Sequence, residues 1–109
     1  MRLYVPSTLD LLRTAAAEGV VRYDDPVVAD SDGEEDEYAA METAAGLSAE
    51  LLEGPGRRVV LVLETASSDA CDLDDLVSIH ADTEPVDPQD DDLPELAWFA
   101  VQELGDLLG

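Results

Sequence analysis

Val59-Val60-Leu61-Val62-Leu63 is an unbroken apolar run near the middle of the chain. Successive side chains of a strand point to opposite faces of a sheet, so a run without polar residues predicts a central strand buried on both faces. We therefore expect Leu61 and Val62 to point to opposite sides and both to be buried. Such a strand needs helices on both faces, or one helical layer and another partner layer. The preceding pair, Arg57-Arg58, is expected to start the strand and to pair with a nearby acid.

Shorter strand patterns lie on either side of this run. Alternation of apolar and polar residues predicts strands at residues 2–5, 20–23, 77–81 and 96–101. Pro6 is expected to end the first strand. In the third, Val77 is expected to face the core and His80 the solvent. In the last, one of the adjacent rings of Trp98 and Phe99 is expected to enter the core while the other faces out.

Two helices are predicted from apolar residues spaced three and four apart. Ser7 is expected to cap the first, with Asp10 completing a capping box, and Gly19 to end it. Its inward stripe is Leu9, Leu12 and Ala16, widened by Leu11 and Ala15. Acidic residues crowd the first turn of the second helix, where the helix dipole favours them, and Gly54-Pro55-Gly56 ends it. Its inward stripe is Tyr38, Met41, Ala45, Ser48 and Leu52.

These elements predict a single α+β domain over residues 1–109. Helices must cover the central apolar strand, so we expect a two-layer sandwich of about four to five strands covered by two helices. Residues 103–108 are expected to add a terminal turn of helix. A right-handed crossover is expected to link the first strand to the next one parallel to it.

The chain carries 27 acidic residues against five arginines and no lysine, for a formal net charge of −22. Nineteen of the acids lie in three stretches with frequent Pro, Gly, Ser and Asp, which predicts that the charge sits mainly on connections. Two of these are acidic loops at about 24–36 and 82–95. Because clustered carboxylates repel, we expect the free energy of unfolding to rise with salt. Five arginines cannot neutralise phosphates broadly, so direct binding of DNA or RNA is not expected.

Motifs for metals and phosphates are incomplete. Asp30-Ser31-Asp32-Gly33 resembles the start of a calcium loop, but with Gly33 at the sixth position of an EF-hand the first and twelfth positions are Val28 and Ala39. Both essential carboxylates are therefore missing. Gly54-Pro55-Gly56 lacks the lysine and the following helix of a phosphate loop. We predict no metal or cofactor site, and weak binding of a hard cation by residues 82–92 is the metal alternative.

His80 is the single histidine of the chain. Asp82 lies two residues further on and is expected to project to the same side of the strand, which would raise the pKa of His80. The sequence places no Ser or Cys nucleophile beside this pair. Cys71 lies among acidic residues, whose negative field disfavours its thiolate. We therefore predict that the protein is not an enzyme and has no catalytic residues.

The location is predicted from three features. No stretch approaches the roughly 18–20 apolar residues that span a bilayer. The residues from Met1 to Pro6 lack the pattern of a signal peptide. Cys71 is the only cysteine, so no intrachain disulfide can form. We expect a cytoplasmic protein that does not bind membranes.

Several segments form a recognisable pattern: Arg2–Pro6 with Leu9, Leu11 and Leu12, then Glu37–Ala40, Arg57–Val60, Val77–Asp82 and Trp98. On this pattern, which covers about half of the chain, the sequence resembles a small uncharacterised actinobacterial protein family. The resemblance fades between Val20 and Glu35. The family has no assigned activity, so the resemblance implies a compact α+β fold.

Three functions remain open. The leading hypothesis is a non-enzymatic protein that acts through protein–protein contacts with a basic partner, because electrostatic steering speeds such association. The alternatives are a nucleic-acid mimic that inhibits a DNA- or RNA-binding protein, and a metal-dependent enzyme that uses carboxylates and His80. Mimicry gains support if the fold brings the two acidic loops together and loses it if the fold holds them apart. The candidate partner-binding residues are Glu34, Glu35, Asp36, Asp90, Asp91, Asp92 and Trp98.

Overall fold

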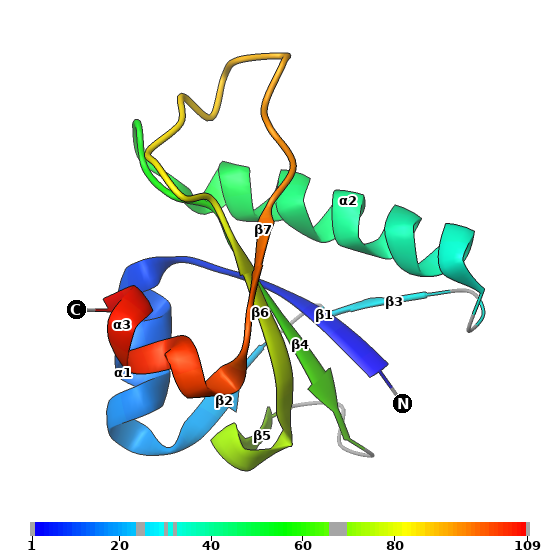
Figure 1. Ribbon diagram of the computed structural model, residues 1–109, viewed down its shortest axis with the longest axis vertical. Coiled ribbons are helices and arrows are strands. Elements are labelled where there is room, and N and C mark those ends of the chain that lie inside the picture. Colours follow the sequence, from blue (N-terminus) through cyan, green and yellow to red (C-terminus); the bar gives the residue numbers. More distant parts are fainter. Residues whose placement is uncertain (1, 24–25, 30, 32, 66–69, 109) are drawn as a thin grey trace.

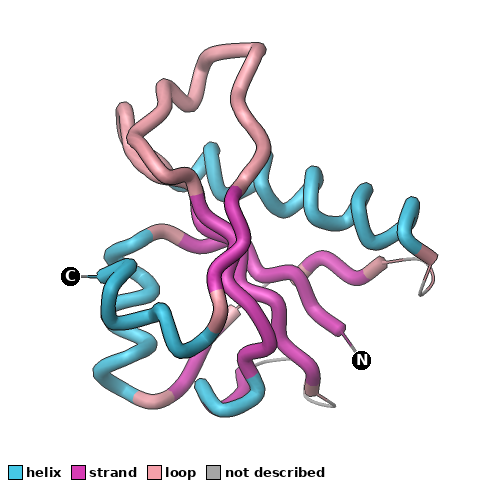
Figure 2. Tube along the Cα trace, in the orientation of Figure 1, coloured by secondary structure: helices cyan, strands magenta, loops and turns pink. Residues whose placement is uncertain are grey.

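The computed structural model describes residues 2–23, 26–29, 31, 33–65 and 70–108. Figure 1 shows the arrangement of the elements, and Figure 2 separates helices from strands. The strands are β1 (Arg2–Ser7), β2 (Val20–Arg22), β3 (Val27–Val28), β4 (Val59–Glu64), β5 (Ala70–Asp72), β6 (Leu76–Ala81) and β7 (Ala97–Phe99). The helices are α1 (Leu9–Glu18), α2 (Glu34–Leu51) and α3 (Leu104–Leu108), with short 3-10 helices η1 (Leu73–Asp75) and η2 (Val101–Glu103).

The apolar run forms β4, the middle strand of a five-stranded sheet with the order β3-β1-β4-β6-β7. Leu61 packs into one apolar cluster with residues of α1 and α3, and Val62 packs into another with residues of α2. Both side chains are buried. The predicted opposite orientation of these two residues is therefore confirmed, and so is the α+β class. Of the two arrangements expected for a doubly buried strand, the fold has helices on both faces of the sheet, with α2 on one side and α1 and α3 on the other (Figure 1). The sheet is therefore the middle of three layers, where two layers were expected.

Helix α2 presents its smallest residues to the sheet. Ala40, Ala44 and Ser48 are buried at four-residue spacing, with Ala45 and Ala49 beside them. Small side chains let the helix axis approach β1 and β4 closely. The face that packs on the sheet is therefore the alanine-rich face, which is rotated about the helix axis from the predicted inward stripe. Ala45 and Ser48 belong to both the predicted stripe and the observed buried face. The prediction that Tyr38 points inward is wrong, since this residue is 53% exposed.

The junction between β1 and α1 differs from the prediction by one or two residues. β1 continues through Pro6, which is possible because β3 pairs only with Leu3 and Tyr4 and so does not reach Pro6. The N-cap is Thr8, whose Oγ1 accepts a hydrogen bond of 3.2 Å from the backbone N–H of Leu11, so the predicted capping box at Ser7 is wrong.

Within α1, Gly19 ends the helix as predicted, with a φ of 75° that favours glycine. Leu12 and Ala15 are buried, and Leu9 packs against the same core cluster. Leu11, which was expected to widen the inward stripe, is instead exposed. The buried face of this helix is therefore narrower than the apolar pattern indicated.

Neighbouring strands are antiparallel in every described pair. The expected right-handed crossover between parallel neighbours is therefore wrong, since antiparallel neighbours do not need one. The brief strand predicted at residues 20–23 is present as β2, which pairs with β5 in a separate two-stranded sheet. β3 and β5 were not predicted, because both lie in acidic stretches that were assigned to connections.

A bulge alters the side-chain pattern of β6. Val62 pairs with Ser78, whereas the next residue, Leu63, pairs with Leu76, so Val77 is the extra residue on β6. Leu76 therefore enters the core, and Val77, which was predicted to face the core, is 43% exposed. The prediction for the two adjacent rings of β7 is confirmed, because Phe99 packs against the core and Trp98 is 62% exposed.

Candidate functional site

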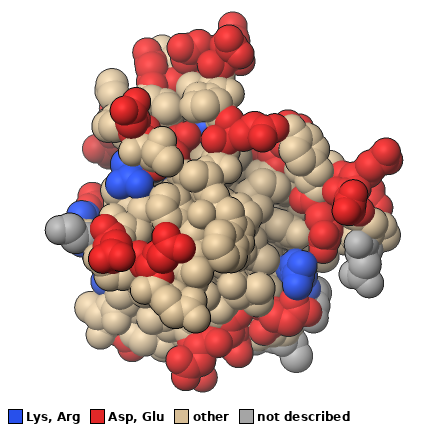
Figure 3. All heavy atoms as spheres, viewed as in Figure 1, with Lys and Arg blue, Asp and Glu red and all other residues tan. Residues whose placement is uncertain are grey.

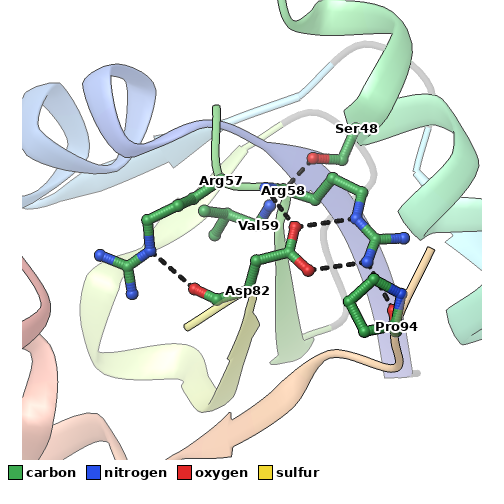
Figure 4. A network of polar contacts seen from close by, with 6 residues as sticks. All are labelled: Ser48, Arg57, Arg58, Val59, Asp82 and Pro94. Carbon is green, nitrogen blue, oxygen red and sulfur yellow. Dashed lines mark hydrogen bonds and ion pairs between the residues drawn. The ribbon is translucent and has the colours of Figure 1, made fainter. Parts of the chain in front are cut away.

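A buried ion pair connects the start of β4 to both ends of the acidic segment that follows β6 (Figure 4). The Asp82 carboxylate accepts hydrogen bonds from the backbone N–H of Arg58 at 2.8 Å, from its Nε at 2.8 Å and from its Nη2 at 2.7 Å. Arg58 Nη2 also donates to the carbonyl of Pro94 at 2.6 Å. Arg58 is 6% exposed and Asp82 is 2% exposed. The arginine thus fixes residue 82 and residue 94 at the same point of the fold.

The predicted role of the arginine pair is confirmed in this network. Arg58 pairs with an acid at the start of β4, and Arg57 Nε donates to the carbonyl of Asp82 at 2.6 Å. Asp82, however, was expected to belong to the acidic loop at residues 82–95. Its burial removes it from the charge that this loop presents to solvent.

Ser48 holds α2 against the sheet at the same level (Figure 4). Its Oγ donates to the carbonyl of Ser7 at 2.7 Å and accepts from the backbone N–H of Val59 at 2.9 Å. One buried hydroxyl therefore links α2 to β1 and β4. Ser48 thus holds α2 and Arg58 holds Pro94 on neighbouring parts of the sheet, and a space remains between α2 and residues 95–96.

A groove with a volume of about 430 Å³ lies in this space. α2 forms one wall, and β6 and the segment before β7 form the other. At its outer end, the Tyr38 hydroxyl donates to Glu95 Oε1 at 3.3 Å. The lining residues are Tyr38, Met41, Glu42, Ala45, Gly46, Arg58, His80, Glu95 and Leu96.

Trp98 lies on the same face of the sheet as the groove. It pairs directly with His80 across β6 and β7, and directly opposed residues of an antiparallel pair project to the same face. In the described part of the chain, β7 has β6 as its one neighbour, so Trp98 stands at a sheet edge. An exposed indole at an edge strand is a typical contact residue for a partner.

The groove is electronegative. The Arg58 charge is engaged by Asp82, and burial lowers the pKa of His80, so its imidazole is neutral at pH 7. Glu42 and Glu95 contribute carboxylates to the lining. A side-chain hydrogen bond with Glu42, followed by the charges of Glu42 and Glu95, raises the pKa of Tyr38. The lining therefore combines aromatic and apolar surface with two negative charges.

The environment of His80 differs from the sequence prediction. Its Nε2 lies 3.0 Å from the Ser78 hydroxyl, and the Asp82 carboxylate is bound by Arg58. The expectation that Asp82 raises the His80 pKa is wrong, because desolvation lowers it. His80 is also half-buried rather than solvent-facing. The contact with Ser78 was missed, although alternate residues of a strand share one side and the spacing alone could have indicated it.

The lowered His80 pKa predicts a pH effect on stability. The unfolded chain binds a proton at His80 more readily than the folded protein, so this residue destabilises the fold progressively as the pH falls below about 6.5. We expect the unfolding free energy of the wild type, relative to that of His80→Gln, to decrease from pH 7 to pH 5. Urea unfolding of both proteins measures this difference and cancels the common effect of the carboxylates. A constant difference would contradict the assigned environment of His80.

The fold separates the predicted acidic contact residues. Glu34, Glu35 and Asp36 form the first turn of α2, whereas the loop residues Pro88, Gln89 and Leu93 lie against Gly46 and the end of that helix. Gly46 follows Glu34 by twelve positions in the helix, which corresponds to a rise of about 18 Å. Asp90, Asp91 and Asp92 therefore do not join the acidic turn in one patch, and the two groups flank the groove from its two ends.

Figure 3 shows how the acids are placed on one face of the molecule. Acidic side chains surround a neutral area that lies over β6 and β7.

Asp24, Asp25, Asp30 and Asp32 lie outside the described residues, as does the Cys71 side chain. Within the described residues, no group of three or more His, Cys, Asp or Glu side chains is arranged to hold a metal ion. No described helix combines the length and the apolar character needed to cross a membrane.

The antiparallel sheet with helices on both faces defines a small α+β domain. Its candidate site is the acidic groove beside α2. The chain belongs to the DUF6912 family, a family of unknown function whose model matches residues 1–108. No curated protein and no solved structure matches the chain. Membership of an uncharacterised family, expected from the sequence, is thereby confirmed.

Proposed function

We propose that this protein is a non-enzymatic binding protein that holds a positively charged part of a partner protein in the groove beside α2. The observation that carries the proposal is the lining of that groove. Tyr38, Met41 and Leu96 offer aromatic and apolar surface, while Glu42 and Glu95 supply negative charge. This is the environment that favours the long apolar stem and charged head of an arginine or lysine side chain.

Two features support a cationic ligand over an anionic or neutral one. The Arg58 charge is already engaged by Asp82 and Pro94, so this arginine is not available to an anion. Tyr38 and Trp98 are exposed aromatic rings, and a cation over such a ring gains about 0.5–1 kcal/mol at an exposed site. The acids at both ends of the groove would also draw a basic partner toward it.

The two alternative functions have weaker support. A mimic of a nucleic acid needs carboxylates that continue across the contact surface, whereas on the face in Figure 3 a neutral area separates them. The carboxylate and histidine enzyme gains no support from Asp82, the acid nearest to His80 in the sequence, because both Asp82 oxygens accept hydrogen bonds from Arg58. The placement of these residues therefore favours binding through the groove.

The test compares two matched double variants in a binding assay with basic proteins captured at low salt. Glu42→Gln with Glu95→Gln removes two charges from the groove, and Glu103→Gln with Asp106→Asn removes two charges from η2 and α3. We expect the groove variant to slow association several-fold and to flatten its salt dependence, because nearby charges act mainly on the association rate. The control variant should behave as the wild type. Equal effects of the two variants would show that only the total charge matters and would contradict the proposal.

A further inference from the structure

A second hollow continues the groove along α2. It has a volume of about 530 Å³ and lies between the last turns of the helix and the acidic loop. Its lining residues are Gly46, Ala49, Glu50, Leu52, Pro88, Gln89 and Leu93. Gly46 belongs to both hollows, so they meet at this residue and form one long depression beside the helix.

The packing of the chain does not require a glycine at position 46. It lies in the interior of α2, where glycine is less favourable than alanine. A Cβ placed on it would meet no heavy atom within 4 Å, and its φ is not in the left-handed region. The junction of the two hollows therefore leaves helix backbone uncovered, and another backbone can approach it closely there.

The length and charge of the depression define its occupant. The helix rises by about 20 Å from Tyr38 to its end at Leu51, and an extended chain advances about 3.3 Å per residue. About six or seven extended residues therefore span it. Glu42 and Glu95 lie in the first hollow and Glu50 in the second, so carboxylates occur along its whole length.

We propose that the partner contributes an extended segment of about six or seven residues with spaced arginine or lysine side chains. The segment lies along α2 from Tyr38 to Leu52 and crosses the helix at Gly46. This inference rests on the proposed function and adds the form and the path of the ligand. A second copy of the same chain is a poor occupant, because each copy carries a net charge of −22.

The experiment measures the affinity of a fluorescent seven-residue peptide of alternating arginine and alanine by fluorescence anisotropy at low salt. Gly46→Leu fills the junction of the two hollows and should weaken binding at least tenfold. Gly105→Leu is the matched control, since Gly105 also lies in a helix and has free space at its Cβ position. Gly46→Ala should weaken binding less than Gly46→Leu. Melting curves establish that the variants are folded.

Two further probes separate charge from path. The same peptide with citrulline in place of arginine keeps the shape and loses the charge, and it should bind at least tenfold more weakly than the arginine peptide. A three-residue version should also bind more weakly, because it cannot reach both hollows. Equal affinity of the short and long peptides would overturn the inference.

The outcomes distinguish the two proposals. Binding that is unchanged by Gly46→Leu would overturn the path along α2. The proposed function would still stand in that case, because the protein would still bind a basic ligand. No binding of the arginine peptide up to millimolar concentration would overturn both. A wild-type dimer in molar salt that Gly46→Leu converts to a monomer would identify the occupant as a second copy and would overturn the inference.

Discussion

Replacing Asp82 with alanine is expected to lower the free energy of unfolding by about 3–5 kcal/mol, because it leaves the Arg58 guanidinium buried without its counter-charge. The carboxylate accepts three hydrogen bonds from Arg58, and both side chains are almost completely buried. Urea denaturation followed by circular dichroism measures the change. The substitution should also weaken peptide binding, since Arg58 holds Pro94 beside the groove.

Asp90→Ala provides the control for this prediction. Asp90 is an exposed acid of the same loop whose Oδ1 accepts one hydrogen bond, from the backbone N–H of Asp92 at 3.1 Å, so its removal should change stability by no more than about 1 kcal/mol. Replacing the pair together, as Arg58→Met with Asp82→Leu, should recover part of the loss, because no buried charge is then left alone. Similar stability of the Asp82→Ala and Asp90→Ala variants would show that the Arg58–Asp82 pair does not organise the loop.

Replacing Val62 with aspartate is expected to cost at least about 4 kcal/mol, because it buries an unpaired charge and removes apolar contacts with α2. Val62 is buried on the α2 side of the central strand, against the alanines of that helix. We expect the variant to be largely unfolded or to melt at a much lower temperature than the wild type. Thermal unfolding by circular dichroism measures the effect.

Val77→Asp is the matched control, since it makes the same change in a neighbouring strand at an exposed residue. Its melting temperature should stay close to that of the wild type. A soluble Val62→Asp variant with an unshifted melting curve would refute the burial of β4 on both faces.

The long periodic elements were predictable from the sequence. The apolar run of β4 is buried on both faces, and both predicted helices are present. The errors lie where local patterns are short or ambiguous. Thr8 caps α1 in place of Ser7, because both residues can accept the capping hydrogen bond and the strand extends to Ser7. The bulge at Val77 depends on strand pairing, which a single strand pattern does not reveal.

The site was less predictable, because its parts come from distant segments. Arg58 and Asp82 are 24 residues apart, and Tyr38 and Glu95 are 57 residues apart. The acidic triplet Asp90, Asp91 and Asp92 was the obvious candidate in the sequence, whereas the groove contains Glu42, which lies outside the acidic stretches, and Glu95, the last acid of the loop. Trp98 was identified as a contact residue because one of two adjacent rings had to face out. Its position beside His80 follows from the β6–β7 register, which only the fold supplies.

The central claim is that a positively charged segment binds in the groove beside α2. Nuclear magnetic resonance titration of isotope-labelled protein with the arginine–alanine peptide tests it most directly, because each backbone amide and the Trp98 indole N–H reports separately. We predict that the shifted signals concentrate in residues 38–52 and 88–98, include the Trp98 indole, and return to their free positions in high salt. Shifts confined to the exposed acids of α1 and α3, or no shifts at millimolar peptide, would contradict the claim.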